Sequence, residues 1–171
     1  MRVLLTGFMG AGKTTVGRLL AEKLRLPFVD LDAEIEARSG LAVRELFACH
    51  GEAEFRRLER QLLVEMLARD PLVMATGGGT LVDPDNLALA KGAGLVIWLN
   101  PPFAVIARRI GPLGKRDRPL FPDEAAAFDL YRRRLPAYQR ADLQIDVGAA
   151  ESAPEVAARA ALRVSELLCS T

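Results

Sequence analysis

Residues 7–15 have the sequence GFMGAGKTT, which fits the phosphate-loop pattern G-x-x-x-x-G-K-[ST]. The apolar run at residues 3–6 before it is typical of a buried parallel strand. After it, apolar residues recur at helical spacing over residues 16–24. A chance match to the pattern in a chain of this length has a frequency of about 1% or less. The stretch therefore predicts a phosphate-binding loop between a first strand and a first helix.

The chemistry of phosphate binding explains the composition of this loop. Its glycines let backbone N–H groups turn toward phosphate oxygens, where a Cβ atom would obstruct them. The helix that follows directs its positive N-terminus at the same anion. We expect Lys13 to reach the β- and γ-phosphates of ATP, and the hydroxyl of Thr14 to bind Mg²⁺. The expected nucleotide contacts in the loop are Gly10, Ala11, Gly12, Lys13, Thr14 and Thr15.

The composition is that of an ordinary globular protein. The 171 residues are 50% hydrophobic and 26% charged, which predicts a single domain over residues 1–171 with a sizeable core. The formal net charge of +1 gives no general attraction to nucleic acid. Cys49 and Cys169 have no metal or redox spacing, and no apolar run approaches the length of a membrane span. We expect a cytoplasmic monomer with no membrane or nucleic-acid partner.

Two carboxylates follow the second predicted strand, at residues 27–29. Asp30 and Asp32 lie where ligands bind in open parallel sheets, and in an extended chain they would face the same side. One carboxylate could then lie near Mg²⁺ and the other on the phosphoryl acceptor. Alternatively, Asp32 is the cap of a helix that begins at Ala33. The residues alone leave both interpretations open.

Helices are predicted at residues 33–39, about 43–49 and about 52–69, with breaks at Gly40 and Gly51. Arg56 lies off the apolar stripe of the third helix, and Glu59 follows it at i+3. This pair is either a solvated ion pair or an anion-binding arginine that Glu59 holds in place. The apolar stripe consists of Phe55, Leu58, Leu62, Leu63, Met66 and Leu67.

The third predicted strand, residues 72–76, continues directly into Gly77, Gly78 and Gly79. A simple turn needs fewer glycines, so the triplet indicates a substrate or phosphate close to the backbone. Many phosphate-loop proteins place an acidic metal ligand at the end of this strand. Because none is present here, Asp30 is the better candidate for the outer shell of the metal.

Further strands are predicted at residues 95–99 and 143–145, and further helices at 84–92, 103–110, 123–140 and from Ser152 onward. The last helix has a core face of Val156, Ala160, Val164, Leu167 and Leu168. Segment 111–122 has glycines and prolines at both ends and basic residues in the middle. It is either a lid over phosphates or a solvated charged loop. This order of elements predicts a parallel sheet covered on both faces.

Taken together, these motifs resemble the shikimate kinase family in order and spacing over essentially the whole chain. The resemblance implies an α/β fold like that of the nucleoside-monophosphate kinases, with a five-stranded parallel sheet in a three-layer sandwich. It also implies a substrate-binding helical insert at residues 33–60 and a lid at residues 111–122. The motifs that carry it are the phosphate loop, Asp30-x-Asp32 followed by Ile35-Glu36, G-E-x-x-F-R-x-x-E at residues 51–59, the glycine triplet, R-P-L at 118–120 and R-x-P-x-Y at 134–138.

The activity implied by the resemblance is ATP-dependent phosphorylation of the 3-hydroxyl of shikimate, on the route to chorismate and the aromatic amino acids. Shikimate is a carboxylate with three hydroxyls, so its site needs cations and hydrogen-bond acceptors. Asp32 matches the residue at the reacting hydroxyl, and Arg56 and Arg134 match the carboxylate-binding arginines. The glycine triplet matches the substrate-binding turn.

The resemblance also implies the nucleotide and metal contacts. Arg118 matches the lid arginine at the transferring phosphate, and Arg109 is expected to stack on the adenine. Thr14 matches the direct ligand of Mg²⁺, with Asp30 acting through water. The chain departs from related sequences at residues 148–154, which contain no basic residue, so adenine contacts there would come mostly from the backbone.

Three alternatives remain at this point. A kinase of another polyhydroxy carboxylate, such as gluconate, would also need an arginine, although the pairing of Arg56 with Arg134 favours shikimate. A nucleotide-dependent switch without a small acceptor is disfavoured, because the third strand lacks the acidic residue typical of water-activating enzymes. An inactive homologue is disfavoured because every matched position is present.

Overall fold

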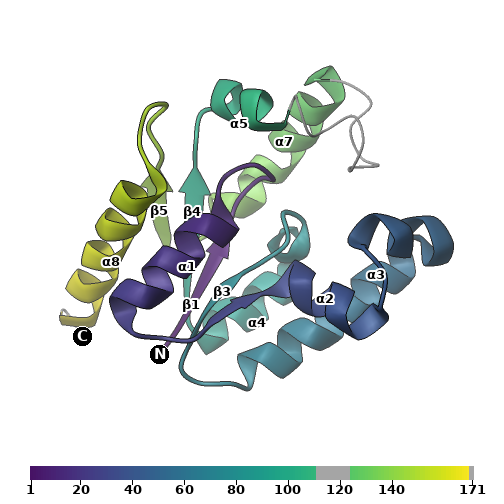
Figure 1. The fold of residues 1–171 in the computed structure, drawn as a ribbon, viewed down its shortest axis with the longest axis horizontal. Helices are drawn as coiled ribbons and strands as arrows, with labels where there is room; N and C mark the ends of the chain where they lie inside the picture. The colour runs from purple at the N-terminus through teal and green to yellow at the C-terminus, as the bar shows by residue number, and fades with distance from the viewer. Residues whose placement is uncertain (111–123, 170–171) are drawn as a thin grey trace.

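The computed structural model describes residues 1–110 and 124–169, and Figure 1 shows their arrangement. The lid predicted at residues 111–122, with Arg118, lies outside the described residues. Within them, no helix is long and apolar enough to cross a membrane.

Five parallel strands form one sheet in the order β2-β3-β1-β4-β5. This is the five-stranded parallel sheet that the sequence predicts. Its first and third strands are central, so the loops that follow them meet at the middle of the carboxyl edge. The strands are β1 (Arg2–Thr6), β2 (Phe28–Asp30), β3 (Leu72–Ala75), β4 (Leu95–Asn100) and β5 (Leu143–Asp146).

Helices cover both faces of the sheet, because successive side chains of a strand point to opposite sides (Figure 1). Val3 and Leu5 of β1 pack with helices α1 (Lys13–Leu24) and α8 (Ala153–Cys169). Leu4, between them, packs with α2 (Leu31–Ser39), α3 (Val43–Leu67) and α4 (Pro84–Ala93). The result is the predicted three-layer sandwich.

A third apolar cluster lies at the carboxyl end of the sheet. Phe8 of the phosphate loop and Trp98 of β4 pack there against helices α5 (Phe103–Ile110) and α7 (Glu124–Tyr138). Proline commonly ends or kinks a helix, but α7 continues through Pro136 for two further residues. This continuation keeps Tyr138 one helical turn from Arg134.

The two predicted breaks in the helical insert are confirmed. Gly40 ends α2 in the left-handed region at φ 69°. Gly51 interrupts α3 at φ 78° and ψ 172°, a conformation that side-chain-bearing residues rarely adopt. The second part of α3 buries its predicted apolar stripe, and it ends at Leu67 rather than at residue 69.

Two sequence predictions about helix ends are wrong. Helix α2 begins at Leu31 and not at Ala33, and its cap is Asp30, whose Oδ1 accepts from the backbone N–H groups of Asp32 (3.1 Å) and Ala33 (3.3 Å). In α8, Leu167 and Leu168 are 40% and 57% exposed. The buried stripe of α8 ends at Val164 in the described chain, so its last turn lies outside the core.

Adjacent residues of α3 provide a test of this packing. Leu63 is fully buried and Val64 is 49% exposed. We expect Leu63→Ala to lower the free energy of unfolding by about 2–5 kcal/mol, because it leaves a cavity under the helix that carries Arg56. Val64→Ala should change it by about 0.5 kcal/mol or less. Urea denaturation of the two variants measures both values, and equal losses would contradict the assigned face of α3.

Candidate active site

The phosphate loop connects β1 to α1 and has the backbone geometry of an anion site. Gly7, Gly10 and Gly12 have φ values of 139°, 76° and 94°, which favour glycine. A Cβ at Gly7 would also lie 2.6 Å from the carbonyl oxygen of Leu99. Within the described residues, no side chain caps the N-terminus of α1 at Gly12. Backbone N–H groups at this end of α1 can therefore donate hydrogen bonds to phosphate oxygens.

Two cationic side chains contact this loop. The Nζ of Lys13 donates to the carbonyl oxygens of Gly7 (2.9 Å) and Phe8 (3.1 Å). From α5, Nη1 of Arg109 donates to the carbonyl oxygen of Gly10 (3.1 Å). Lys13 thus lies at the loop, where the sequence predicts it. Arg109 lies beside the loop as well, and its stacking on adenine stays a prediction.

A hydroxyl and a carboxylate meet beside the loop. The Oγ1 of Thr14, in the first turn of α1, donates to Oδ2 of Asp30 over 2.6 Å. Hard oxygen donors of this kind suit Mg²⁺, which commonly takes one or two protein ligands and completes its shell with phosphates and water. The described residues contain no cluster of three or more His, Cys, Asp or Glu for a metal. The donor set therefore fits a magnesium ion shared with a nucleotide.

Asp32 lies in the first turn of α2, in an unusual electrostatic environment. Burial raises the pKa of its carboxyl from 3.8 to about 6, against the opposing effect of Lys13, and the carboxylates of Asp30 and Glu59 add to the increase. A carboxyl with this pKa can exchange a proton near neutral pH. Its Oδ1 lies 2.8 Å from the position that a Cβ would take at Gly77. Asp32 therefore faces the glycine triplet.

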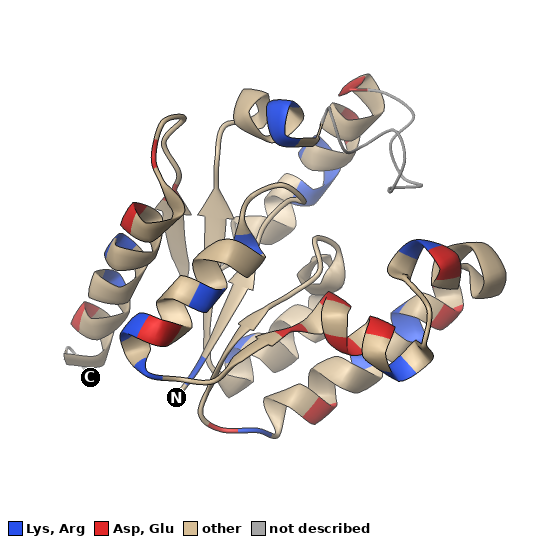
Figure 2. Ribbon diagram, in the orientation of Figure 1, with Lys and Arg blue, Asp and Glu red and all other residues tan. Residues whose placement is uncertain are grey.

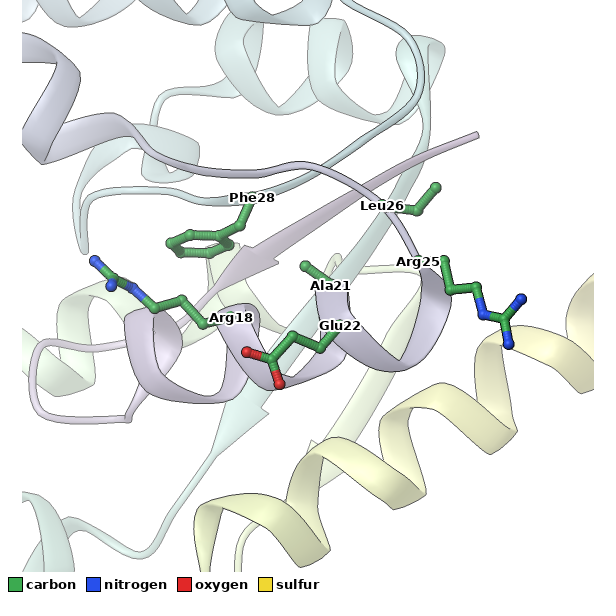
Figure 3. A pocket seen from close by; sticks show the side chains of 6 residues that line it. All are labelled: Arg18, Ala21, Glu22, Arg25, Leu26 and Phe28. Carbon is green, nitrogen blue, oxygen red and sulfur yellow. The ribbon is translucent and has the colours of Figure 1, made fainter.

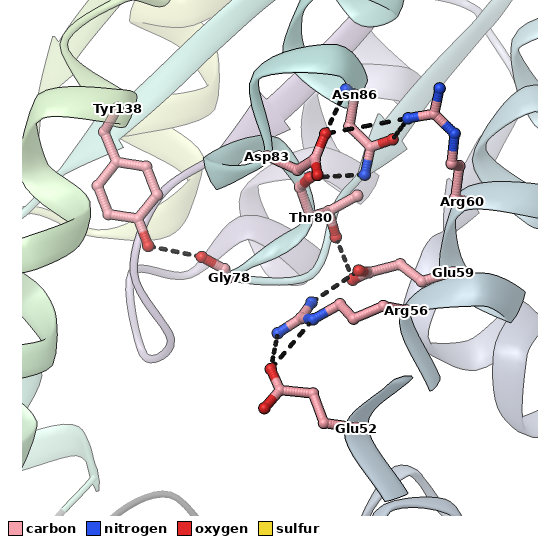
Figure 4. A network of polar contacts seen from close by, with 9 residues as sticks. All are labelled: Glu52, Arg56, Glu59, Arg60, Gly78, Thr80, Asp83, Asn86 and Tyr138. Carbon is pink, nitrogen blue, oxygen red and sulfur yellow. Dashed lines mark hydrogen bonds and ion pairs between the residues drawn. The ribbon is translucent and has the colours of Figure 1, made fainter. Parts of the chain in front are cut away.

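Arg56 is held by a buried carboxylate, as Figure 4 shows. Its Nη1 donates to Oε2 of Glu59 over 2.7 Å, and Glu59 is only 1% exposed. The other oxygen of Glu59 accepts from Oγ1 of Thr80 over 2.6 Å. Glu52 makes a longer contact of 3.4 Å with the outer side of the guanidinium. Of the two sequence interpretations of the Arg56–Glu59 pair, the solvated one is wrong.

The glycine triplet lies where the side chains of three predicted site residues converge. A Cβ at Gly79 would be 2.8 Å from Nη2 of Arg56 and 3.2 Å from Nη2 of Arg134, and one at Gly78 would be 3.5 Å from Nη1 of Arg134. None of the three glycines has a φ in the left-handed region. The triplet is therefore required by close approach of the two arginines and Asp32, rather than by backbone conformation.

Sequence reasoning missed some polar residues of this site. Tyr138 donates its hydroxyl to the carbonyl oxygen of Gly78 over 2.6 Å (Figure 4). Thr80 lies on the short helix η1 (Thr80–Val82), where its backbone oxygen accepts from Nδ2 of Asn86 over 3.0 Å. The predicted R-x-P-x-Y motif contained Tyr138, but only its distance from Gly78 in the fold indicates what the hydroxyl does.

The loop at residues 148–154 contains no basic side chain, but a basic residue of α8 reaches it. Glu151 accepts from the backbone N–H of Gly148 over 2.9 Å and pairs with Nη2 of Arg159 over 2.9 Å. No sequence pattern identifies Arg159 as a partner of this loop, because it lies eight residues beyond Glu151 on a surface helix.

Figure 2 shows acidic positions gathered on α2 and basic positions on α5 and α7, at the two sides of the loop. A separate groove lies along α1 and β2 (Figure 3), where the guanidinium of Arg18 covers the ring of Phe28 at 5.5 Å. None of the sequence-predicted site residues lines it. The candidate active site is therefore the carboxyl edge of the sheet, and not this groove.

A phosphate loop after β1, in a parallel sheet of order 2-3-1-4-5, defines a kinase of the nucleoside-monophosphate-kinase-like class. The family profile described as shikimate kinase matches residues 9–165. A shikimate kinase of Aromatoleum aromaticum is 47% identical over 86% of this chain and 86% of its own length. One of Synechococcus elongatus is 44% identical over 94% of this chain and 84% of its own length. The chain belongs to the shikimate kinase family.

Solved structures agree with this assignment. Shikimate kinase from Acinetobacter baumannii, solved in complex with shikimate, superposes with a TM-score of 0.86 at 36% identity, covering 99% of this chain and 93% of that one. A gluconokinase from Sinorhizobium meliloti superposes with a TM-score of 0.61 at 18% identity, over 98% of this chain and 94% of that one. The second likeness shows a shared fold alone.

The raised pKa of Asp32 predicts a pH-dependent gain of stability in Asp32→Asn. The folded chain holds a proton on Asp32 between pH 3.8 and about 6 that the unfolded chain has lost. Ionisation of Asp32 therefore lowers the free energy of unfolding as pH rises through this window. At pH values above the window the loss reaches about 3 kcal/mol. We expect ligand-free Asp32→Asn to be more stable than the wild type at pH 7.5 and equal to it near pH 4.

Urea denaturation at the two pH values measures this difference. The matched control is Asp129→Asn, the same substitution at an exposed position of α7. Loss of stability in Asp32→Asn at both pH values would contradict the assigned environment of the carboxyl.

Proposed function

We propose that this chain transfers the γ-phosphoryl group of ATP to the 3-hydroxyl of shikimate, giving shikimate 3-phosphate and ADP. The observation that carries the proposal is the convergence of Asp32, Arg56 and Arg134 on one glycine turn beside the phosphate loop. Such a site offers two cations for a carboxylate and one carboxyl for a hydroxyl. Membership of the shikimate kinase family supports the same substrate.

Arg56 and Arg134 are the proposed partners of the substrate carboxylate. A guanidinium presents parallel N–H donors to a carboxylate, which gives orientation as well as attraction. Arg56 is anchored by Glu59, and Arg134 is 8% exposed, so neither needs to be ordered when the substrate binds. We assign the backbone of Gly77, Gly78 and Gly79 to the substrate hydroxyls, because no side chain there blocks approach.

Asp32 is the proposed acceptor of the proton from the 3-hydroxyl. Phosphoryl transfer has a loose transition state, so orientation of the hydroxyl matters more than early removal of its proton. A pKa of about 6 keeps Asp32 mainly ionised at pH 7 while leaving it able to hold the proton late in the reaction. Lys13 is assigned to the charge of the transferring phosphate, together with Arg118 from outside the described residues.

The nucleotide site is assigned to Gly10, Ala11, Gly12, Lys13, Thr14 and Thr15, with Arg109 beside the loop. We assign Mg²⁺ to Thr14 directly and to Asp30 through water, since the two side chains are in contact at the loop. When bound, the ion would supply positive charge that offsets the charge of the phosphates. We further infer that residues 33–60 form the substrate-binding part of one domain, that residues 111–122 close over the nucleotide, and that the chain works as a cytoplasmic monomer.

The test is ADP release from Mg-ATP with shikimate, with gluconate and with no acceptor. We expect release with shikimate only, because the paired arginines and the glycine turn should hold a compact ring carboxylate in line with the phosphate. A coupled ADP assay with product identification by mass spectrometry measures it. Release with gluconate alone would contradict the substrate, and equal release without any acceptor would contradict the kinase assignment.

A further inference from the structure

The hydroxyl of Tyr138 is a buried polar group without a role in the reaction described above. Tyr138 is 1% exposed, and burial raises the pKa of its hydroxyl to about 12. The group therefore keeps its proton at any pH where the protein works. It donates that proton to the carbonyl oxygen of Gly78 over 2.6 Å (Figure 4).

The same hydroxyl lies near the arginine proposed to bind the carboxylate. Arg134, one turn earlier on α7, opposes the effect of burial on the pKa of Tyr138. The Nη1 of Arg134 lies 3.5 Å from the position that a Cβ would take at Gly78, the residue whose carbonyl oxygen accepts from Tyr138. Tyr138 and Arg134 therefore meet at the same glycine.

The position of this atom is fixed by the sheet. The ring of Tyr138 stacks on Trp98 of β4, with centroids 6.1 Å apart and an interplanar angle of 29°. Trp98 itself is 3% exposed. The hydroxyl therefore projects from a rigid aromatic pair and not from a mobile surface side chain.

The glycine turn needs such a restraint. Glycine has the largest backbone freedom of any residue, and here three occur in sequence. The carbonyl oxygen of Gly77 accepts from the N–H of Thr80 (3.3 Å), and that of Gly79 accepts from the N–H of Val82 (3.2 Å). The middle carbonyl, of Gly78, accepts instead from Tyr138. Its orientation, and that of the adjoining N–H, therefore depends on a side chain from α7.

We propose that Tyr138 is a positioning residue for the acceptor substrate, because its hydroxyl fixes the Gly78 peptide beside the Arg134 guanidinium. This inference rests on the proposed function. Tyr138 itself does not touch the reacting atoms. Before the substrate binds, it holds in place the backbone that meets the substrate hydroxyls, next to the cation that meets the substrate carboxylate.

The test is Tyr138→Phe, which removes the hydroxyl and keeps the ring on Trp98. We expect the KM for shikimate to rise about tenfold or more, since the hydrogen bond that orients the glycine turn is lost. The KM for ATP should stay within about twofold, because the phosphate loop has its own hydrogen bonds. Steady-state kinetics with each substrate varied in turn separates the two effects.

The matched control is Tyr131→Phe, at the other of the chain's two tyrosines. Tyr131 also lies on α7 and packs among aromatic rings, 5.5 Å from that of Phe8, and its side chain is only partly buried. Its substitution should leave both KM values unchanged. A second readout is 3-fluorotyrosine incorporated into Tyr131→Phe, which places a single ¹⁹F label at Tyr138. Its resonance should shift with shikimate and follow the binding curve.

The outcomes separate the two proposals. Wild type that uses shikimate, with an unchanged shikimate KM in Tyr138→Phe, would overturn the role of Tyr138 and leave the function standing. An equal rise of the KM for shikimate and of the KM for ATP in Tyr138→Phe would indicate a structural role only. That result would also overturn the positioning role of Tyr138. An unmoved ¹⁹F resonance would do the same even if Tyr138→Phe failed to fold. Wild type that does not use shikimate would overturn both proposals.

Discussion

The buried carboxylate of Glu59 is the interaction on which the acceptor half of this site depends. A carboxylate that is 1% exposed loses its hydration and must be compensated by charge and hydrogen bonds. Arg56 and Thr80 supply these at 2.7 Å and 2.6 Å, from α3 and η1. The same contacts fix the guanidinium of Arg56 and the helix that follows the glycine turn. Since Asn86 then binds the backbone of Thr80, α4 is held to the same network.

This arrangement explains why the site is electrostatically costly without ligands. Asp30, Asp32 and Glu59 gather at one edge of the sheet, and their mutual repulsion adds to burial in raising the pKa of Asp32. A cation at Thr14 and Asp30 would offset part of that cost, and substrate groups at Arg56 and Arg134 would complete the charge balance. A binding site whose charged groups are arranged before the ligand binds commonly lowers the stability of the ligand-free protein.

Local sequence patterns could predict most of the fold. The phosphate loop, the apolar run of the first strand and the helix breaks at Gly40 and Gly51 all follow from the preferences of neighbouring residues. The start of α2 could not be fixed this way, because Asp30 and Asp32 are both competent caps two residues apart. The exposure of Leu167 and Leu168 depends on how far the surface against which α8 packs extends. The helical periodicity of the sequence carries no information about that length.

The residue types of the site could be predicted from the sequence. Which of these residues are buried, and which of them contact one another, could not. Arg57 and Glu54 form an ion pair of 2.6 Å on α3 with the same three-residue separation as Arg56 and Glu59, yet that pair is on the surface. Spacing alone cannot distinguish the two pairs, so the sequence left the role of Arg56 open. Likewise, Tyr138 and Gly78 are sixty residues apart, and only the fold brings them together.

The central claim, that buried Glu59 organises the acceptor site, is tested by binding calorimetry on Glu59→Gln and Glu54→Gln. Both substitutions remove the acidic member of an Arg–Glu pair on α3, at 2.7 Å and 2.6 Å. The account predicts shikimate affinity at least about tenfold weaker in Glu59→Gln, ADP affinity within about twofold, and no change in Glu54→Gln. Equal shikimate affinity in the two variants would contradict it.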